Sequence, residues 1–364
     1  MKQHDYPTVV QIESTSMCNG ECIMCSHAYR DKNDGKHLGF EKRKLFEEVL
    51  PFAETVKIHG LGEPFLNPEI VEWLSFYKRY GVHLSTFTNM TVLDERILEA
   101  IGSAFTSLHI SCDGCSKPVY EAIRRKLRFD TFIQNVKLLH SCFPDLILHM
   151  HTVAMRQNLA ELERFADFAA ELGFSSVHFS HLSIDPFLNN SSDSLLYSHL
   201  AGEKFLLAEK RGKALGVEVT FPRIYEPAQS CSAEGRGLAI DKKISFRTEV
   251  LPDEGISASG YHCQGMCDWL TDLAYIDLEG NVSLCCSKYY LTMGNLCRQS
   301  FRAIWNNEKY RRLRQLFSEG KVPNVCRGCR TLAEGAMRGV ALTDFDNGFL
   351  EIQPIGALRK GIVL

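Results

Sequence analysis

Residues 8–25, TVVQIESTSMCNGECIMC, join an apolar stretch typical of a β-strand to a loop with three cysteines. These are Cys18, Cys22 and Cys25, with three residues in the first gap and two in the second. Because they directly follow the apolar stretch, we expect them at the carboxyl end of a strand. Three thiolates at this spacing suit an iron–sulfur cluster in which one iron stays open to an exchangeable molecule. A zinc knuckle or three incidental thiols are the alternative interpretations.

The sequence after this loop alternates between strand-like and helix-like stretches. Further strands are expected at residues 54–60, 81–89, 107–114, 146–154 and 175–182. Amphipathic helices are expected at residues 67–80, 93–102, 129–143 and 158–173, where apolar side chains recur every three or four positions. This alternation predicts a parallel sheet with crossover helices. Six such units are too few for a closed barrel, so we predict an α/β fold built on a partial (β/α)6 TIM-like barrel, with functional residues after the strands.

The strand–helix alternation ends near residue 222, after a helix around 197–215 and a short strand. The next stretch is polar and aperiodic, which indicates a boundary between domains. Seven of the 14 cysteines then lie beyond residue 260. We predict a barrel at 1–222, a linker at 223–260, a small cysteine-rich α+β domain at 261–345 and a tail at 346–364.

Composition excludes several classes of function. The 41 Lys and Arg residues nearly balance the 44 Asp and Glu residues, and a net charge of -3 gives no footprint for nucleic acid or an anionic membrane. No apolar run is long enough for a membrane span, and the N-terminus lacks the apolar core of a secretory signal. We therefore expect a cytoplasmic protein without nucleic acid or membrane partners, whose thiols are metal ligands or buried side chains rather than disulfides.

The C-x3-C-x2-C loop after the first strand resembles that of the radical S-adenosylmethionine (radical SAM) superfamily. Three later motifs strengthen the resemblance, each after a successive strand: HGLGEPFLNP at 59–68, FTNM at 87–90 and SCDG at 111–114. The sequence VYEAIRRKLRFDTFIQNV at 119–136 continues the family pattern. The resemblance implies that the cysteine loop holds a 4Fe-4S cluster and that the following residues contact S-adenosylmethionine: Gly62, Glu63, Pro64, Asn89, Ser111 and Asp113. Met90 stands where the family has a glycine.

A second set of cysteines has the spacing of a complete tetrathiolate site. Cys267 precedes Gly280 by twelve intervening residues, Cys285 follows after four more, and Cys326 and Cys329 form a C-x2-C pair. A structural zinc ribbon is one interpretation. The order also resembles the SPASM or shorter twitch extension of some radical SAM enzymes, and since no cysteine follows Cys329 it implies one auxiliary 4Fe-4S cluster. A fully ligated cluster has no free iron for a substrate, so it moves electrons or holds the domain together.

The resemblance implies an enzyme that reductively cleaves S-adenosylmethionine to a 5'-deoxyadenosyl radical, which removes a hydrogen atom from a substrate. Oxidation would follow if an electron passes to the auxiliary cluster, and epimerisation if a thiol such as Cys231 returns hydrogen; a tolerated loop thiol is the plainer interpretation of Cys231. The substrate would be a small carbohydrate-type metabolite or a peptide, and the electron donor a flavodoxin or ferredoxin. The chain shows no separate segment before the first strand to grip a leader peptide, which favours a small molecule or short peptide.

Two alternatives remain open. One is a peptide maturase of the RiPP type that forms a crosslink or thioether. The other, from a different class, is a non-catalytic iron–sulfur electron carrier or a zinc-stabilised scaffold, which would need neither Glu63 nor the SCDG motif. His178, Ser180 and His181 end the sixth predicted strand, where side chains that point inward would touch a substrate and solvated ones would not.

Overall fold

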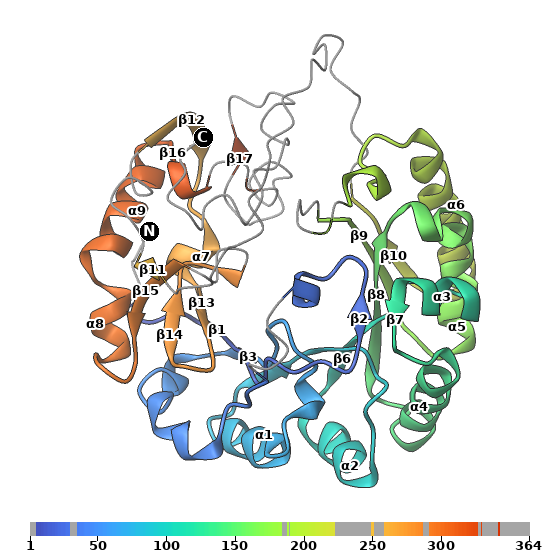
Figure 1. Cartoon of the computed structure of the whole chain (residues 1–364), viewed down its shortest axis with the longest axis horizontal. Coiled ribbons are helices and arrows are strands. Elements are labelled where there is room, and N and C mark those ends of the chain that lie inside the picture. Colours follow the sequence, from blue (N-terminus) through green and yellow to red (C-terminus); the bar gives the residue numbers. More distant parts are fainter. Residues whose placement is uncertain are drawn as a thin grey trace.

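The strands of the first part of the chain form an incomplete barrel with helices on its outer side, which makes the base and right arm of the horseshoe in Figure 1; the C-terminal part of the chain makes the left arm. The structure is a computed structural model and describes residues 5–29, 35–183, 188, 190–222, 249–250, 258–286, 291–326, 329 and 341–342. The barrel strands are β1 (Val9–Ile12), β3 (Thr55–Lys57), β4 (His83–Ser85), β5 (Phe87–Thr88), β6 (Ser107–Ser111), β8 (Ile147–Ala154), β9 (Ser176–His181) and β10 (Glu218–Thr220). Neighbouring strands are parallel throughout β1-β3-β4 and β5-β6-β8-β9-β10. The predicted partial α/β barrel is confirmed.

Helices connect successive strands, as the alternation predicts. They are α1 (Ile70–Lys78), α2 (Glu95–Ala104), α3 (Lys117–Ile123), α4 (Phe129–Cys142), α5 (Phe165–Glu171) and α6 (His199–Leu215). Local signals fix their ends: the Asp94 side chain accepts a hydrogen bond from the Ile97 amide at 2.7 Å and so caps α2, and α6 ends at Gly216 in the left-handed conformation. The predicted helix at 158–173 differs, because its first half is the 3-10 helix η6 (Arg156–Arg164).

Short 3-10 helices complete the barrel region. They are η1 (Ser26–Tyr29), η3 (Phe40–Leu45), η4 (Leu50–Phe52), η5 (Pro64–Leu66) and η7 (Ser191–Asp193). In addition, β2 (Glu21–Cys22) in the cysteine loop pairs antiparallel with β7 (Arg124–Arg125). That two-residue pairing attaches the cysteine loop to the segment after α3.

The C-terminal part of the chain extends the barrel sheet. Strand β13 (Leu273–Ile276) pairs in parallel with β1, and β14 (Asn281–Ser283), β15 (Leu291–Asn295) and β11 (Glu249–Val250) continue the same sheet. A separate three-stranded sheet holds β12 (Ala258–Gln264), β16 (Lys321–Pro323) and β17 (Ala341–Leu342). The remaining elements are α7 (Asp268–Thr271), α8 (Phe301–Trp305), α9 (Glu308–Ser318) and the 3-10 helix η10 (Asn324–Cys326).

One continuous core lies beneath both parts of the chain. Ile12 of β1 and Ile276 of β13 are fully buried in it, together with Trp305 of α8. The Arg314 guanidinium is also buried here and donates to the carbonyls of Leu270 and Trp305 at 2.6 and 2.8 Å. The cysteine-rich part is therefore packed onto the first barrel strand rather than tethered to it. Of the helices that the structure describes, none is long and apolar enough to cross a membrane.

Candidate functional site

The loop after β1 carries the first three predicted ligands. Cys18, Cys22 and Cys25 are partly exposed, and none forms a disulfide. They lie close enough that the negative charge of one thiolate raises the pKa of another. Burial is the main reason why the pKa values of Cys18 and Cys22 rise to about 11 and about 12. At neutral pH these thiols stay protonated until a metal displaces the proton, so metal loading will release protons.

The cysteine loop rests on the turn after β3. The Glu63 amide donates to the Met17 carbonyl at 2.8 Å. A Cβ atom on Gly62 would lie 2.2 Å from the Thr15 carbonyl oxygen and 2.5 Å from that of Met17. Only glycine allows the two backbones to approach this closely. Gly62 therefore sets the position of the loop immediately before Cys18.

The Glu63 carboxylate is buried beneath this contact. It accepts hydrogen bonds from the Thr88 hydroxyl and the Asn89 amide, both at 2.7 Å, and a longer one from the Phe65 amide at 3.5 Å. Burial raises the pKa of Glu63 to about 7, although these three bonds favour the ionised form. Pro64, also buried, begins η5 directly after it. A buried carboxylate titrating near neutrality is suited to receiving a cationic group.

Asn89 holds the cysteine loop from the other side. Its side-chain amide donates to Asn19 at 2.8 Å, and its carbonyl oxygen accepts from the Thr91 amide and hydroxyl at 2.9 and 2.6 Å. Met90 adopts a φ of 57°, the left-handed conformation for which glycine is expected. The turn is thus retained without a glycine, and the Asn89 side chain contacts the residue that follows Cys18.

Ser111 and Asp113 lie at the carboxyl end of β6, but their surroundings differ. Ser111 ends the strand and is partly exposed. Asp113 is fully buried: it accepts from the Val153 amide at 2.7 Å and pairs with Arg124, with 2.7 Å from Oδ2 to Nη2. Arg124 lies opposite Cys22 in the β2–β7 pair. Asp113 therefore acts on the cysteine loop through Arg124.

Arg124 and Asn19 are contact residues to which the sequence assigned no role, although Arg124 lies in the stretch 119–136 that continues the family pattern. Burial is the largest single influence on the pKa of Arg124 and lowers it, but the combined attraction of Asp113 and the neighbouring acidic groups outweighs burial, so the pKa is raised. The guanidinium keeps its charge and lowers the pKa of Cys22 against the effect of burial. Its place in that family pattern was the available signal for Arg124. No comparable signal marked Asn19.

The second set of cysteines lies at element ends of the C-terminal part. Cys267 immediately precedes α7, Cys285 follows β14, and Cys326 ends η10. The Cys329 amide donates to the Cys326 carbonyl at 3.0 Å, as expected for a tight C-x2-C turn. All four are partly buried. Cys231, most of the predicted linker and the predicted tail lie outside the described residues.

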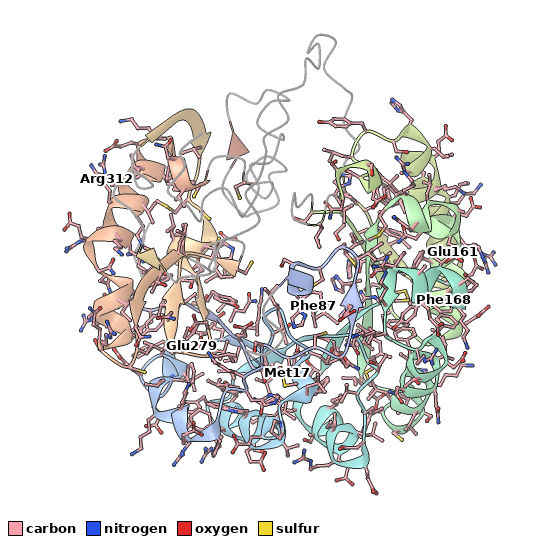
Figure 2. The ribbon with its side chains drawn as sticks, viewed as in Figure 1. Met17, Phe87, Glu161, Phe168, Glu279 and Arg312 are labelled. Carbon is pink, nitrogen blue, oxygen red and sulfur yellow. The ribbon has the colours of Figure 1, made fainter. Side chains whose placement is uncertain are left out.

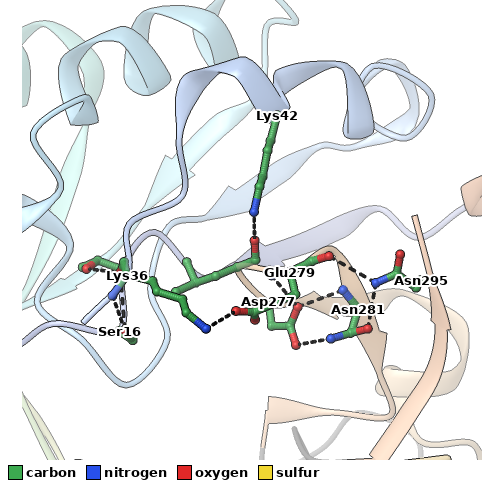
Figure 3. A network of polar contacts seen from close by, with 9 residues as sticks. Ser16, Lys36, Lys42, Asp277, Glu279, Asn281 and Asn295 are labelled. Carbon is green, nitrogen blue, oxygen red and sulfur yellow. Dashed lines mark hydrogen bonds and ion pairs between the residues drawn. The ribbon is translucent and has the colours of Figure 1, made fainter. Parts of the chain in front are cut away.

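A network of polar contacts joins the cysteine loop to the β13–β14 turn (Figure 3). The backbone of Lys36 exchanges hydrogen bonds with Ser16, and its ammonium pairs with Glu279 at 3.3 Å. Lys42 donates to the Leu278 carbonyl at 2.7 Å. Inside the turn, Asp277 accepts from the amides of residues 279 and 281 at 3.0 and 2.8 Å. The two cysteine-bearing parts are thus held together by direct contacts.

The donor chemistry fits iron–sulfur clusters better than single ions. In the part of the chain that the structure describes, no group of three or more His, Cys, Asp or Glu side chains could hold a metal ion. An iron–sulfur cluster has a different requirement from a single metal ion, because each protein sulfur binds a different iron and the sulfurs need not converge on one point. Three neighbouring cysteines on a short loop, none of them in a disulfide, meet that requirement.

Comparisons with known proteins identify both parts. Residues 12–169 match the Radical SAM superfamily, and residues 267–330 match the SPASM iron–sulfur cluster-binding domain. The mycofactocin maturase MftC of Mycolicibacterium smegmatis is 27% identical over 172 residues, which are 46% of this chain and 43% of that protein. The tungsten-containing aldehyde ferredoxin oxidoreductase cofactor-modifying protein of Pyrococcus furiosus is 22% identical over 179 residues, which are 47% of this chain and 50% of that protein. The chain therefore spans about half the length of these relatives.

Solved structures agree on the fold. Streptococcus suis SuiB bound to S-adenosylmethionine superposes with a TM-score of 0.64 at 13% identity, covering 86% of this chain and 68% of SuiB. Native anSMEcpe with bound AdoMet gives 0.55 at 15% identity, covering 85% and 83%. The chain belongs to the radical SAM superfamily, carries a C-terminal SPASM domain, and has as its cofactors S-adenosylmethionine and two 4Fe-4S clusters, one that binds S-adenosylmethionine and one auxiliary.

Proposed function

We propose that this enzyme oxidises a peptide substrate after removing a hydrogen atom from it. Bound together, the first cluster and S-adenosylmethionine supply a carbon radical able to take a hydrogen atom from an unactivated C–H bond. The chain's own residues bind and orient these groups and exclude water. The observation that carries the proposal is the seating of the Thr15–Met17 backbone on Gly62 and Glu63.

The cysteines of the loop and the residues at the ends of β3 and β6 would bind the cluster and the cofactor. Cys18, Cys22 and Cys25 would each hold one iron and leave the fourth iron to the cofactor. Glu63 and the backbone beside Gly62 would receive the ammonium group of S-adenosylmethionine, since a buried carboxylate pairs strongly with a cation. Ser111 would lie near the cofactor's carboxylate or ribose.

The remaining residues act by positioning. Asn89 would orient the cysteine loop through Asn19, at 2.8 Å, and Asp113 would do so through Arg124, at 2.7 Å. These contacts hold the loop at Asn19 and beside Cys22 and involve none of the cysteine thiols. In this proposal neither Asn89 nor Asp113 needs to touch the cofactor.

The auxiliary site favours oxidation as the outcome. Cys267, Cys285, Cys326 and Cys329 supply four thiols, so a cluster held by all four has no open iron for a substrate. Its role is then to pass on an electron, with a flavodoxin or ferredoxin as the external reductant of the enzyme. Epimerisation would need a hydrogen donor such as Cys231, and that role stays a prediction.

A peptide substrate is supported by the similar proteins. SuiB has been solved bound to the precursor peptide SuiA, and anSMEcpe with a bound peptide. The test is release of 5'-deoxyadenosine by cluster-loaded protein with dithionite, measured alone and with pools of short peptides deuterated on carbon. Stimulated release with deuterium in the 5'-deoxyadenosine supports the proposal. Stimulation by polyols but by none of the peptides would contradict the assigned substrate class.

A further inference from the structure

The inner face of the barrel carries histidines in positions where barrels of this kind usually hold branched apolar side chains. Strand β8 shows the alternation: Leu148 and Met150 are fully buried, whereas His149 and His151 are partly exposed on the opposite face. We call His109, His149, His151 and His178 the imidazole wall. Figure 2 shows the adjoining Phe87 inside the horseshoe and Phe168 among the helices outside it.

Strand register aligns the rings of the wall. His109 is paired with Phe87 on one side and His149 on the other, and the ring centroids are 5.0 and 4.9 Å apart. One row further along, His151 is paired with His178, again at 4.9 Å. These separations match the spacing of adjacent strands, about 4.8 Å. The rings therefore form two ladders across the sheet.

Hydrogen bonds link the ladders and leave ring nitrogens available. His109 Nδ1 lies 2.8 Å from His151 Nε2, and Ser176 Oγ lies 2.7 Å from His149 Nδ1 and 2.8 Å from His178 Nε2. His178 Nδ1 reaches the Thr220 hydroxyl at 2.6 Å. His109, His149 and His151 each use one ring nitrogen in these bonds, so a second remains on each without a hydrogen bond to the described residues.

Basic groups predominate around the wall. The neighbouring groups that act on these imidazoles are His59 and Lys57 on the β3 side and the carboxylate of Glu218 on β10. Five imidazoles and one ammonium thus face a single carboxylate. His59 Nδ1 is buried and has no hydrogen-bond partner in the described part of the chain. An anion would complete this arrangement.

Burial keeps the wall uncharged until such a partner arrives. Burial, followed by repulsion between the imidazoles, lowers the pKa of His109 to about 4 and that of His151 to about 3, and the pKa values of His149 and His178 are also lowered. Neutral imidazoles can still donate N–H groups to an oxyanion. A bound anion would favour the protonated form and raise these pKa values.

We propose that the imidazole wall binds an oxyanion, a carboxylate or phosphate group carried by the substrate. The inference deepens the proposed function, because His151 is paired with Ser111, which we expect beside the cofactor. A substrate anchored on the wall would therefore lie next to the reacting group. The shared chemistry is an oxyanion that accepts imidazole N–H bonds; the two sources differ in charge and size.

The test measures deuterium exchange at the C2 position of each histidine by mass spectrometry, since its rate reports the pKa. Cluster-loaded protein is compared in chloride, acetate and inorganic phosphate at constant ionic strength. We expect acetate or phosphate to raise the pKa values of His151 and His178 by about one unit, equivalent to about tenfold tighter anion binding to the protonated form. A response to acetate alone assigns a carboxylate, and one to phosphate alone assigns a phosphate.

Two variants sharpen the result. His151→Gln should weaken the anion response of His178 roughly tenfold. His83→Asn removes an exposed histidine at the start of β4 and should leave the response unchanged. Unaltered pKa values in the wild-type protein with both anions would overturn the inference. Because no reaction is needed, an anion response without 5'-deoxyadenosine release would count against the proposed function alone, and release without a response would count against the wall alone.

Discussion

Arg124 and Asp113 form a buried ion pair, with 2.7 Å between Nη2 and Oδ2, directly behind Cys22. The side chains are 8% and 0% exposed, so neither charge can be satisfied by bulk water. The pair explains how a short, irregular loop keeps a cysteine at a fixed place next to the barrel. As in other buried ion pairs, removing one partner leaves the charge of the other buried and unpaired, which is strongly destabilising.

Asp113→Asn should therefore be strongly destabilising. Breaking a buried pair costs about 3–5 kcal/mol, which urea unfolding of the variant and the wild type will measure. Asp130→Asn is the matched control, because its pair with Lys117 is exposed to solvent and contributes little to stability. Equal losses in the two variants would show that the Arg124–Asp113 contact has no special role.

Gly62→Ala should displace the cysteine loop. The added methyl group would lie 2.2 Å from the Thr15 carbonyl oxygen, a backbone atom that can move only with the loop. We expect reduced iron at the first cluster and weaker S-adenosylmethionine binding, measured by iron analysis and equilibrium dialysis. Gly81→Ala, which meets open space, should keep its iron despite about 1 kcal/mol of strain at a φ of 71°. Normal iron content in Gly62→Ala would contradict the account of the turn.

Glu63 should make the stability of the folded protein fall as pH rises, whereas a carboxylate whose pKa falls on folding has the opposite effect. Its pKa rises from 4.5 to about 7 on folding, mainly by burial, so its stabilising contribution is complete below 4.5 and is lost as pH rises through 7. The loss is about 3 kcal/mol, from roughly 1.4 kcal/mol per pKa unit. Unfolding of cofactor-free protein with Glu63→Gln as the reference will isolate it. The affinity for S-adenosylmethionine should instead increase as pH rises through 7, because the carboxylate ionises. A fall in both stability and affinity over this pH range would be inconsistent with the role of Glu63.

Met90→Gly tests why the turn after β5 does without its expected glycine. Glycine would relieve about 1–2 kcal/mol of left-handed strain at a φ of 57°. It would also remove a fully buried side chain, which costs at least about 2–5 kcal/mol. The burial term is larger at the middle of both ranges, so the variant should be less stable by about 2 kcal/mol in urea unfolding. A more stable variant would mean that strain decides at this position.

The barrel could be predicted because its strands and helices carry strong periodic signals. Residues 54–60 and 146–154 contain β3 and β8, and the stretch 93–102 largely coincides with α2. The pairing of β1 with β13 could not be predicted, since it joins Val9 to Leu273 across more than half the chain and leaves no local signal. The 3-10 helices between Phe40 and Phe52 could not be predicted either, because their sequence has no sustained helical period.

The sequence likewise indicated some features of the candidate site and not others. Spacing alone marked the cysteines, and motif order marked Glu63 and Asp113. What sequence could not supply was the role of each contact. The Asp113 carboxylate is committed to Arg124 and Val153, and Asn89 to Asn19 and Thr91, because tertiary packing brings these partners together. The histidine pairs of the wall likewise depend on register between strands.

The central claim is tested most directly on anaerobically reconstituted protein. Iron per chain and 5'-deoxyadenosine release with dithionite would be compared between the wild type and a variant with Cys18, Cys22 and Cys25 all changed to alanine. The account predicts about eight irons falling to about four, with release of 5'-deoxyadenosine abolished. Zinc in place of iron, or unchanged release from the triple variant, would contradict it.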